Sequence, residues 1–139
     1  MASLDENKAL VRRWFEDVLN HWRTGVIGDI VGANYRDYAH VPPRIGPDGA
    51  RQGVAELRAA FAEVRFTIDD MIAEGDKVVV IWTGDLTREG VGAGKGVVER
   101  QATVAGINIY RVVDGKLVES RGVDDLRDAL DQIEDLRSP

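Results

Sequence analysis

The sequence predicts an α+β protein in which a curved antiparallel sheet wraps around N-terminal helices and leaves an internal pocket. Three observations predict this class. Apolar residues recur at helical spacing near both ends of the chain, while the second half alternates or is β-branched. The dipeptide Asp114-Gly115, a strong hairpin signal, joins two of the β-like runs. Since most helices precede the strands, they pack as a layer against one sheet, and a curled sheet leaves a cavity beneath it.

The first half of the chain is mainly helical. Residues 4–22 carry an apolar helical face, and Ser3 with Glu6 has the spacing of a capping box. The aromatic residues before Pro42 indicate a weak strand, and the proline- and glycine-rich stretch after it indicates a loop. The strand is expected at 35–40 and the loop at 42–53. A short helix is expected before them, at 26–33, and another helix after them, at 53–61.

The second half is expected to form a meander of long strands. Turns are predicted at 74–76 and 114–115, and a glycine-rich loop at 88–96. Asp125 is placed to cap a final amphipathic helix over 125–136. The four strands are expected at 64–70, 77–87, 97–113 and 116–122.

Composition restricts the function classes. The 139 residues fit one domain spanning 1–139, and the absence of cysteine excludes disulfides and thiol chemistry. The net charge is −6, from 18 basic and 24 acidic residues, with no basic cluster for a phosphate backbone. No run is long enough for a membrane helix, and the acidic N-terminus does not fit a signal peptide. We therefore expect a cytoplasmic protein that binds a small molecule, with no nucleic acid, membrane, metal or cofactor as partner.

Four segments carry a resemblance to a known family. FTIDDMIAEGDKVVVIWTGDLTREG and AGINIYRVVDGKLVE, at 66–90 and 105–119, together with NKALVRRWFEDVLN and GPDGARQGVAELRAAFAEV, at 7–20 and 46–64, resemble the SnoaL-like polyketide cyclase family. That family belongs to the nuclear-transport-factor-like α+β barrels. The resemblance implies a cone-shaped barrel and a cofactor-free enzyme of aromatic polyketide, hence antibiotic, biosynthesis.

The resemblance also implies positions for acid/base groups. The family's carboxylate falls on Gly122, and its two histidines fall on Asn108 and Arg88. Asp124 lies two residues after Gly122 and so has the same strand parity. The nearest imidazole to the family's first-strand histidine, whose position is Tyr38, is His40.

Each candidate catalytic residue has an alternative structural role. Asp124 is either an acid/base or a cap of the last helix. Arg88 either holds an anionic oxygen or is a solvated loop residue. Asn108 lies in an otherwise apolar strand, which favours a pocket role as a donor to an oxyanion. His40 is either a proton-transfer group at a pocket mouth or an exposed loop histidine.

Side chains on the converging elements are candidates for contact with an aromatic ligand. These candidate substrate-binding residues are Trp14, Tyr35, Tyr38, Trp82, Tyr110 and Ser120.

Three functions follow for testing. The first is cyclase-like acid/base chemistry on a polycyclic or polyketide substrate in the cavity. The second is a hydroxylase or epoxide-opening relative on the same fold, for which Arg88 with Asp124 would be part of the site. The third is a non-catalytic small-molecule binding protein. A buried carboxylate in the cavity would favour the enzymes.

The strands carry apolar residues at both parities. Val79, Ile81, Ile107 and Ile109 alternate with the residues expected to face the helices. Since both faces of the sheet then need cover, we expect a homodimer in which a second copy covers the outer face.

Overall fold

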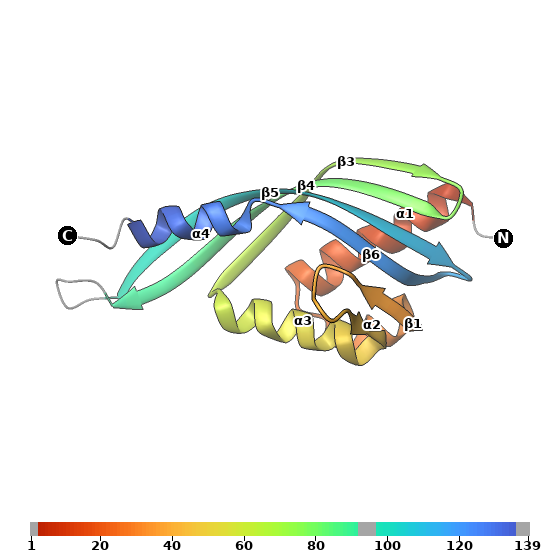
Figure 1. Ribbon diagram of the computed structural model, residues 1–139, viewed down its shortest axis with the longest axis horizontal. Helices are drawn as coiled ribbons and strands as arrows, with labels where there is room; N and C mark the ends of the chain where they lie inside the picture. The colour runs from red at the N-terminus through yellow and green to blue at the C-terminus, as the bar shows by residue number, and fades with distance from the viewer. Residues whose placement is uncertain (1–2, 92–96, 136–139) are drawn as a thin grey trace.

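The computed structural model describes residues 3–91 and 97–135. A curved, unclosed sheet of six strands forms one layer, in the order β2-β1-β6-β5-β4-β3, and the N-terminal helices form the other (Figure 1). The predicted α+β class and curved sheet are confirmed. All neighbouring strands are antiparallel except β1 and β6, which run parallel.

The first helical segment changes type midway. Helix α1 (Leu4–Arg13) begins at a complete Ser3–Glu6 capping box, as predicted, and continues into the π-helix η1 (Trp14–Asn20). Trp22, just beyond η1, has a left-handed φ of 56°, which is strained for a bulky residue and ends the segment sharply.

The structure corrects the prediction for residues 26–60. A 3₁₀ turn, η2 (Thr24–Val26), leads into a short α2 (Ile27–Ile30), and the strand β1 (Val31–Asp37) begins where a helix was expected. Pairing of β1 with β6, distant in sequence, overrides the local helical pattern. The expected 35–40 strand therefore starts and ends earlier.

The predicted loop at 42–53 is also largely wrong. It contains the short strand β2 (Arg44–Ile45) and the first half of helix α3 (Gly46–Ala60). Gly46 adopts a φ of 68° that turns the chain, and Pro47 fits the first helical turn, where no N–H partner is needed. Proline and glycine here start a helix rather than break one.

The four-stranded meander is confirmed, with longer strands than expected. It consists of β3 (Glu63–Glu74), β4 (Lys77–Val91), β5 (Val97–Val113) and β6 (Lys116–Asp124). Asp114 and Gly115 both have positive φ, at 51° and 72°, as a two-residue hairpin turn of the type I′ class requires. Register shifts in the β3–β4 and β5–β6 pairs bend the sheet.

Helix α4 (Leu126–Asp135) packs against β5 (Figure 1). Position 136, the expected end of this helix, and most of the expected glycine-rich loop, 92–96, lie outside the described residues. Among the helices in the described ranges, none combines the length and apolar character that crossing a bilayer requires.

The core lies between the concave face of the sheet and the helices. Phe15 of η1 meets Phe66 and Tyr110 edge to face, at 6.2 Å between ring centroids in each case. Phe66 in turn meets Trp82 at 5.3 Å. These contacts bring aromatic side chains of η1, β3, β4 and β5 together at one place under the sheet.

A side chain satisfies backbone hydrogen-bonding groups on the edge strand β3. The Asn20 amide donates from Nδ2 to the Phe66 carbonyl at 2.8 Å and accepts the Phe66 N–H at 2.7 Å. Asn20 thus supplies both hydrogen bonds that a further strand would supply at that residue.

Candidate functional site

A cavity of about 200 Å³ lies between the concave face of the sheet, η1, α3 and the start of α4. Its wall is mostly aromatic and aliphatic, and two polar side chains enter it, Asn108 from β5 and Asp124 from the end of β6. A mostly apolar cavity with a few convergent polar groups is the usual form of a small-molecule site. The other lining residues are Phe15, Leu19, Leu57, Phe66, Trp82, Leu86, Val104, Tyr110 and Leu126.

Two glycines make room for the side chains that shape this cavity. A Cβ added at Gly106 would lie 2.1 Å from the Trp82 ring, and one at Gly122 would lie 2.6 Å from Asn108 Nδ2. Trp82 pairs with Gly106, and Asn108 with Gly122, as direct neighbours across the sheet. Each large side chain therefore lies over the bare backbone of the next strand.

A hydrogen-bond network runs from the cavity into the core. The Trp82 indole N–H donates to Asn108 Oδ1 at 2.8 Å, and Asn108 Nδ2 donates to Ser120 Oγ at 3.3 Å. Ser120 is hydrogen bonded to the hydroxyls of Tyr35 and Tyr110. The network fixes the Asn108 side chain from its buried side.

The network extends to a second indole, because the Trp14 side chain is also hydrogen bonded to Tyr110. Burial raises the pKa of both Tyr35 and Tyr110 well above the ordinary tyrosine value, and the negative charge of Asp37 raises them further. Both phenols are therefore neutral at physiological pH and can only act as hydrogen-bonding groups.

Five of the six predicted substrate-binding residues meet in this network: Trp14, Tyr35, Trp82, Tyr110 and Ser120. Only Trp82 and Tyr110 of these line the cavity itself. The sixth, Tyr38, follows β1 and stacks under the Arg121 guanidinium, 4.1 Å from the ring centroid, away from the cavity lining.

The side chain of Asp124, rather than that of Asp125, accepts a hydrogen bond at the start of helix α4. Asp124 lines the cavity, is exposed to solvent, and accepts the Leu126 N–H at 3.0 Å through Oδ1. The predicted side-chain cap, Asp125, instead accepts the Ala105 N–H of β5 at 2.8 Å. Asp124 therefore combines the two roles considered for it, a contact with the helix start and a place in the cavity wall.

The other two candidate catalytic residues lie elsewhere. Arg88 stacks on Phe61, with 5.2 Å between its guanidinium carbon and the ring centroid, and donates to the Ala60 carbonyl at 3.4 Å. His40 lines a separate surface depression of about 570 Å³ formed with residues 41–45 and the first turns of α3. The structure thus brings Asn108 and Asp124 together but not Arg88 or His40.

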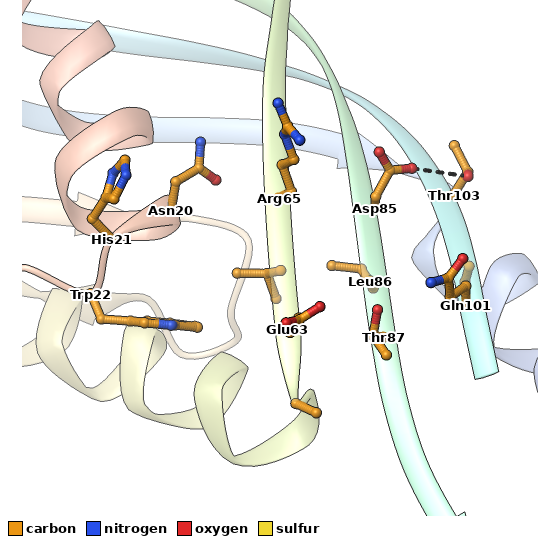
Figure 2. Close-up of a pocket in the computed structure, with 13 residues that line it drawn as sticks. Asn20, His21, Trp22, Glu63, Arg65, Asp85, Leu86, Thr87, Gln101 and Thr103 are labelled. Carbon is orange, nitrogen blue, oxygen red and sulfur yellow. Dashed lines mark hydrogen bonds between the residues drawn. The ribbon is translucent and has the colours of Figure 1, made fainter. Parts of the chain in front are cut away.

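A larger open hollow of about 1000 Å³ lies beside β3 (Figure 2). Figure 2 shows polar side chains from three strands around it, with Asp85 accepting a hydrogen bond from Thr103 at 3.2 Å. Asp85 lies on the face opposite Trp82 and so does not enter the cavity. Because the lining of this hollow is mostly polar, whereas that of the smaller cavity is mostly apolar, we assign the candidate site to the smaller cavity.

Several residues of the cavity could not be recognised from their sequence context. Leu19, Leu57 and Leu126 read as ordinary core positions of three separate helices. Gly106 and Gly122 carry a signal, since glycine is unfavourable inside a strand and marks a close approach by another group. Within residues 3–91 and 97–135, no group of three metal-ligating side chains comes together.

The comparisons agree with this architecture. The family model described as SnoaL-like polyketide cyclase matches residues 9–133. Among curated proteins, none matches the sequence.

Solved structures with the same fold include two candidate polyketide cyclases. The protein from Acidithiobacillus ferrooxidans superposes with a TM-score of 0.80 at 20% identity, covering 97% of this chain and 99% of its own. IdmH from Streptomyces antibioticus superposes with a TM-score of 0.77 at 19% identity, covering 92% of this chain and 98% of its own.

A candidate hydroxylase, AclR from Streptomyces galilaeus, superposes about as well, with a TM-score of 0.76 at 21% identity and coverage of 96% and 98%. At these identities the likeness establishes the fold, and proteins described by different reactions share it.

Proposed function

Since the chain belongs to the SnoaL-like polyketide cyclase family, we propose that it is a cyclase-like enzyme that closes a ring in a polyketide-derived carbonyl compound by acid/base chemistry in the cavity. The observation that carries the proposal is the convergence of Asp124 and Asn108 on an otherwise apolar wall. We extend the proposal to a place in the biosynthesis of aromatic natural products such as antibiotics, in the cytoplasm and without a cofactor.

Asp124 is the proposed acid/base. Its free carboxylate oxygen takes a proton from the carbon next to a substrate carbonyl, and the C–H electron pair becomes an enolate. The enolate carbon then attacks a second carbonyl carbon of the same molecule, and a C–C bond closes the ring. The oxygen of that second carbonyl takes the proton back from Asp124, which returns to its starting state.

Asn108 is the proposed partner of the enolate oxygen. Donors fixed in place before reaction stabilise developing negative charge without reorganising. Its amide is held by Trp82 and Ser120, at 2.8 Å and 3.3 Å, and is therefore fixed in this way.

A hydroxylase or epoxide-opening reaction is the alternative within enzymes. That reading needs Arg88 beside Asp124, whereas Arg88 stacks on Phe61 outside the cavity lining. Ring closure therefore has the better support.

A non-catalytic binding protein is the second candidate function. It is favoured by the exposure of Asp124 and by its bond to the Leu126 N–H, since neither requires catalysis. The substitution Asp124→Asn separates the two functions, because asparagine keeps an oxygen for Leu126 N–H and loses the titrating group.

The test is deuterium exchange at the α-carbon of 2-indanone in D₂O, followed by proton NMR, which reports the proton-transfer step alone. The native protein is expected to accelerate exchange, and Asp124→Asn to lower this acceleration by about 10²–10⁴-fold with an almost unchanged melting temperature. Asp128→Asn, an exposed α4 residue outside the cavity lining, is the matched control. Equal rates for Asp124→Asn and native protein would favour the binding function.

We also propose a homodimer through the outer face of the sheet. Among the large apolar residues exposed there, Ile81 of β4 pairs with Ile107 of β5, which pairs with Val123 of β6. Their exposed fractions are 36%, 44% and 73%. A continuous apolar row across three strands, flanked by Ile72 and Ile109, favours burial against a second copy of the same face.

A further inference from the structure

We infer that the cavity selects a carbonyl compound of one or two fused rings, whose oxygen accepts a hydrogen bond from the Asn108 amide while Trp82 holds that amide in the donating orientation. This inference rests on the proposed function, because it assumes that the cavity is the ligand site. It adds the size of the ligand and the polarity of the contact.

The orientation of the Asn108 amide follows from its partners. An indole N–H can only donate, so the group 2.8 Å from Trp82 Nε1 must be the acceptor Oδ1. The donor Nδ2 consequently lies at the other position, where one of its two N–H groups is bonded to Ser120 Oγ at 3.3 Å. The remaining N–H has no protein partner among the described residues, and the amide lines the cavity.

The rest of the cavity wall leaves this N–H as the donor for a ligand. Tyr110 also lines the cavity, but Ser120 and Trp14 hydrogen bond to its buried hydroxyl. The Trp82 indole N–H is already donated to Asn108. Asp124 as a carboxylate only accepts. In the part of the chain that the structure describes, the remaining lining side chains are apolar.

Trp82 acts as a positioning residue for Asn108. Its ring lies over Gly106, where even a Cβ would approach to 2.1 Å, so the backbone fixes the plane of the indole. Without the indole N–H, the amide could turn over and present Oδ1 to the cavity instead. The polarity of the contact therefore depends on Trp82, although a ligand oxygen would meet Asn108.

The size of the ligand follows from the cavity volume. An apolar cavity of about 150 Å³ holds one benzene ring, and drug-sized ligands occupy about 300 Å³ or more. The volume of about 200 Å³ lies between these limits and suits one or two fused rings. A flat four-ring ketone needs more room than this volume offers.

The experiment uses three bicyclic probes of matched size: 2-indanone, which only accepts a hydrogen bond, indole, which only donates, and indane, which does neither. Dissociation constants come from ligand-observed NMR titration of the full chain, and the four-ring ketone benzanthrone tests the size limit. We expect 2-indanone to bind, benzanthrone not to compete with it, and only one of the two Asn108 Nδ2 proton signals to move on addition of 2-indanone.

Two variants test the polarity of the contact through the ratio of the indole and 2-indanone dissociation constants. Asn108→Asp keeps the acceptor for Trp82 and removes the free donor, so 2-indanone should lose about three- to tenfold in affinity relative to indole. Trp82→Phe should raise the affinity for indole by a similar factor relative to indane, because the released amide can then accept. Indane corrects for any change in cavity volume.

An unchanged ratio in folded Asn108→Asp, absence of 2-indanone binding to native protein, or equal binding of benzanthrone would each overturn the inference. If either variant fails to fold, the Nδ2 proton shifts in native protein decide, and equal shifts or none would overturn it. Selective binding of 2-indanone without accelerated deuterium exchange would leave this inference standing and remove the acid/base function.

Discussion

Asn108 and Gly122 face each other across β5 and β6, and the Asn108 amide fills the space that a side chain at 122 would need. A Cβ at 122 would lie 2.6 Å from Nδ2 and 2.7 Å from Cγ of Asn108. The absence of a carboxylate at Gly122 is therefore a packing requirement of this chain. An acidic side chain could occupy position 122 only if Asn108 moved.

Substituting Gly122 by alanine should disturb both stability and the network. The added methyl group overlaps Asn108, whose amide is held by Trp82 and Ser120, so we expect a loss of about 1–3 kcal/mol in the free energy of unfolding. Urea denaturation measures this loss. Gly25→Ala, where nothing lies within 4 Å of the added Cβ, is the control and should change stability by less than about 0.5 kcal/mol. Equal effects of the two substitutions would contradict the packing argument.

The amide of Asn20 should contribute to stability through the edge of the sheet. Asn20→Ala leaves the Phe66 N–H and carbonyl without the bonds at 2.7 Å and 2.8 Å, and we expect a loss of about 1–3 kcal/mol. Asn34→Ala, an exposed asparagine on β1, is the matched control. Thermal unfolding of both variants gives the comparison, and a Tm for Asn20→Ala as high as that of the control would count against the edge-closing role.

The buried phenols predict a loss of stability in alkali. Burial is the main cause that raises the pKa of Tyr35 and Tyr110 in the folded chain above the ordinary value of about 10. The charge of Asp37 comes second for Tyr35, and the charges of Tyr35 and then Asp37 follow for Tyr110. Below pH 10 the tyrosines are neutral in both states and stability is unaffected. Above it the unfolded chain releases protons that the folded chain keeps, so stability falls as pH rises.

This alkaline behaviour is tested by measuring phenolate absorbance and unfolding in the same pH titration. Phenolate from these two residues should appear only as the chain unfolds, and Tyr35→Phe should lower the pH dependence of stability above pH 10 to about half. Ionisation of Tyr35 and Tyr110 near their ordinary pKa in the folded chain is the opposing outcome.

The outer face of the sheet predicts the oligomeric state. Sedimentation of native protein at micromolar concentration should show a dimer, and Ile107→Glu should shift it to a monomer, because Ile107 lies in the middle of the apolar row. Ala59→Glu adds the same charge to an exposed position on α3 and should leave the dimer intact. A native monomer of about 15 kDa, the mass of one 15.3 kDa chain, would contradict the proposal.

Features set by neighbouring residues were predictable from the sequence. The Asp114-Gly115 turn and the Ser3–Glu6 capping box depend on a few adjacent residues, and both form as expected. The start of β1 at Val31 was not predictable, because it depends on pairing with β6, far along the chain. Gly46 and Pro47 were misjudged for a related reason, since the same residues can end one element and begin the next.

The candidate site was likewise predictable only in part from the sequence. The resemblance and an apolar strand context indicated Asn108, the aromatic pattern indicated Trp82, and the structure puts both in the cavity lining. The resemblance also indicated Arg88, but a position in a strand does not show how far along the strand the cavity extends. Arg88 stacks on Phe61 outside the cavity lining. The partners of Asp124 and Asp125 depended on hydrogen bonds to Leu126 and Ala105, which adjacent sequence positions cannot distinguish.

The parallel pairing of β1 with β6 has a consequence for the order in which the chain folds. Val31 lies opposite Leu117, and Arg36 opposite Glu119, so the two-residue strand β2 is the strand that can pair with β1 until residues 117–120 have been synthesised. The β3–β4–β5 hairpins, in contrast, pair with near neighbours and can form during synthesis. β1 can therefore complete its pairing only after β6 has formed, and we expect this long-range pairing to be a late step of folding.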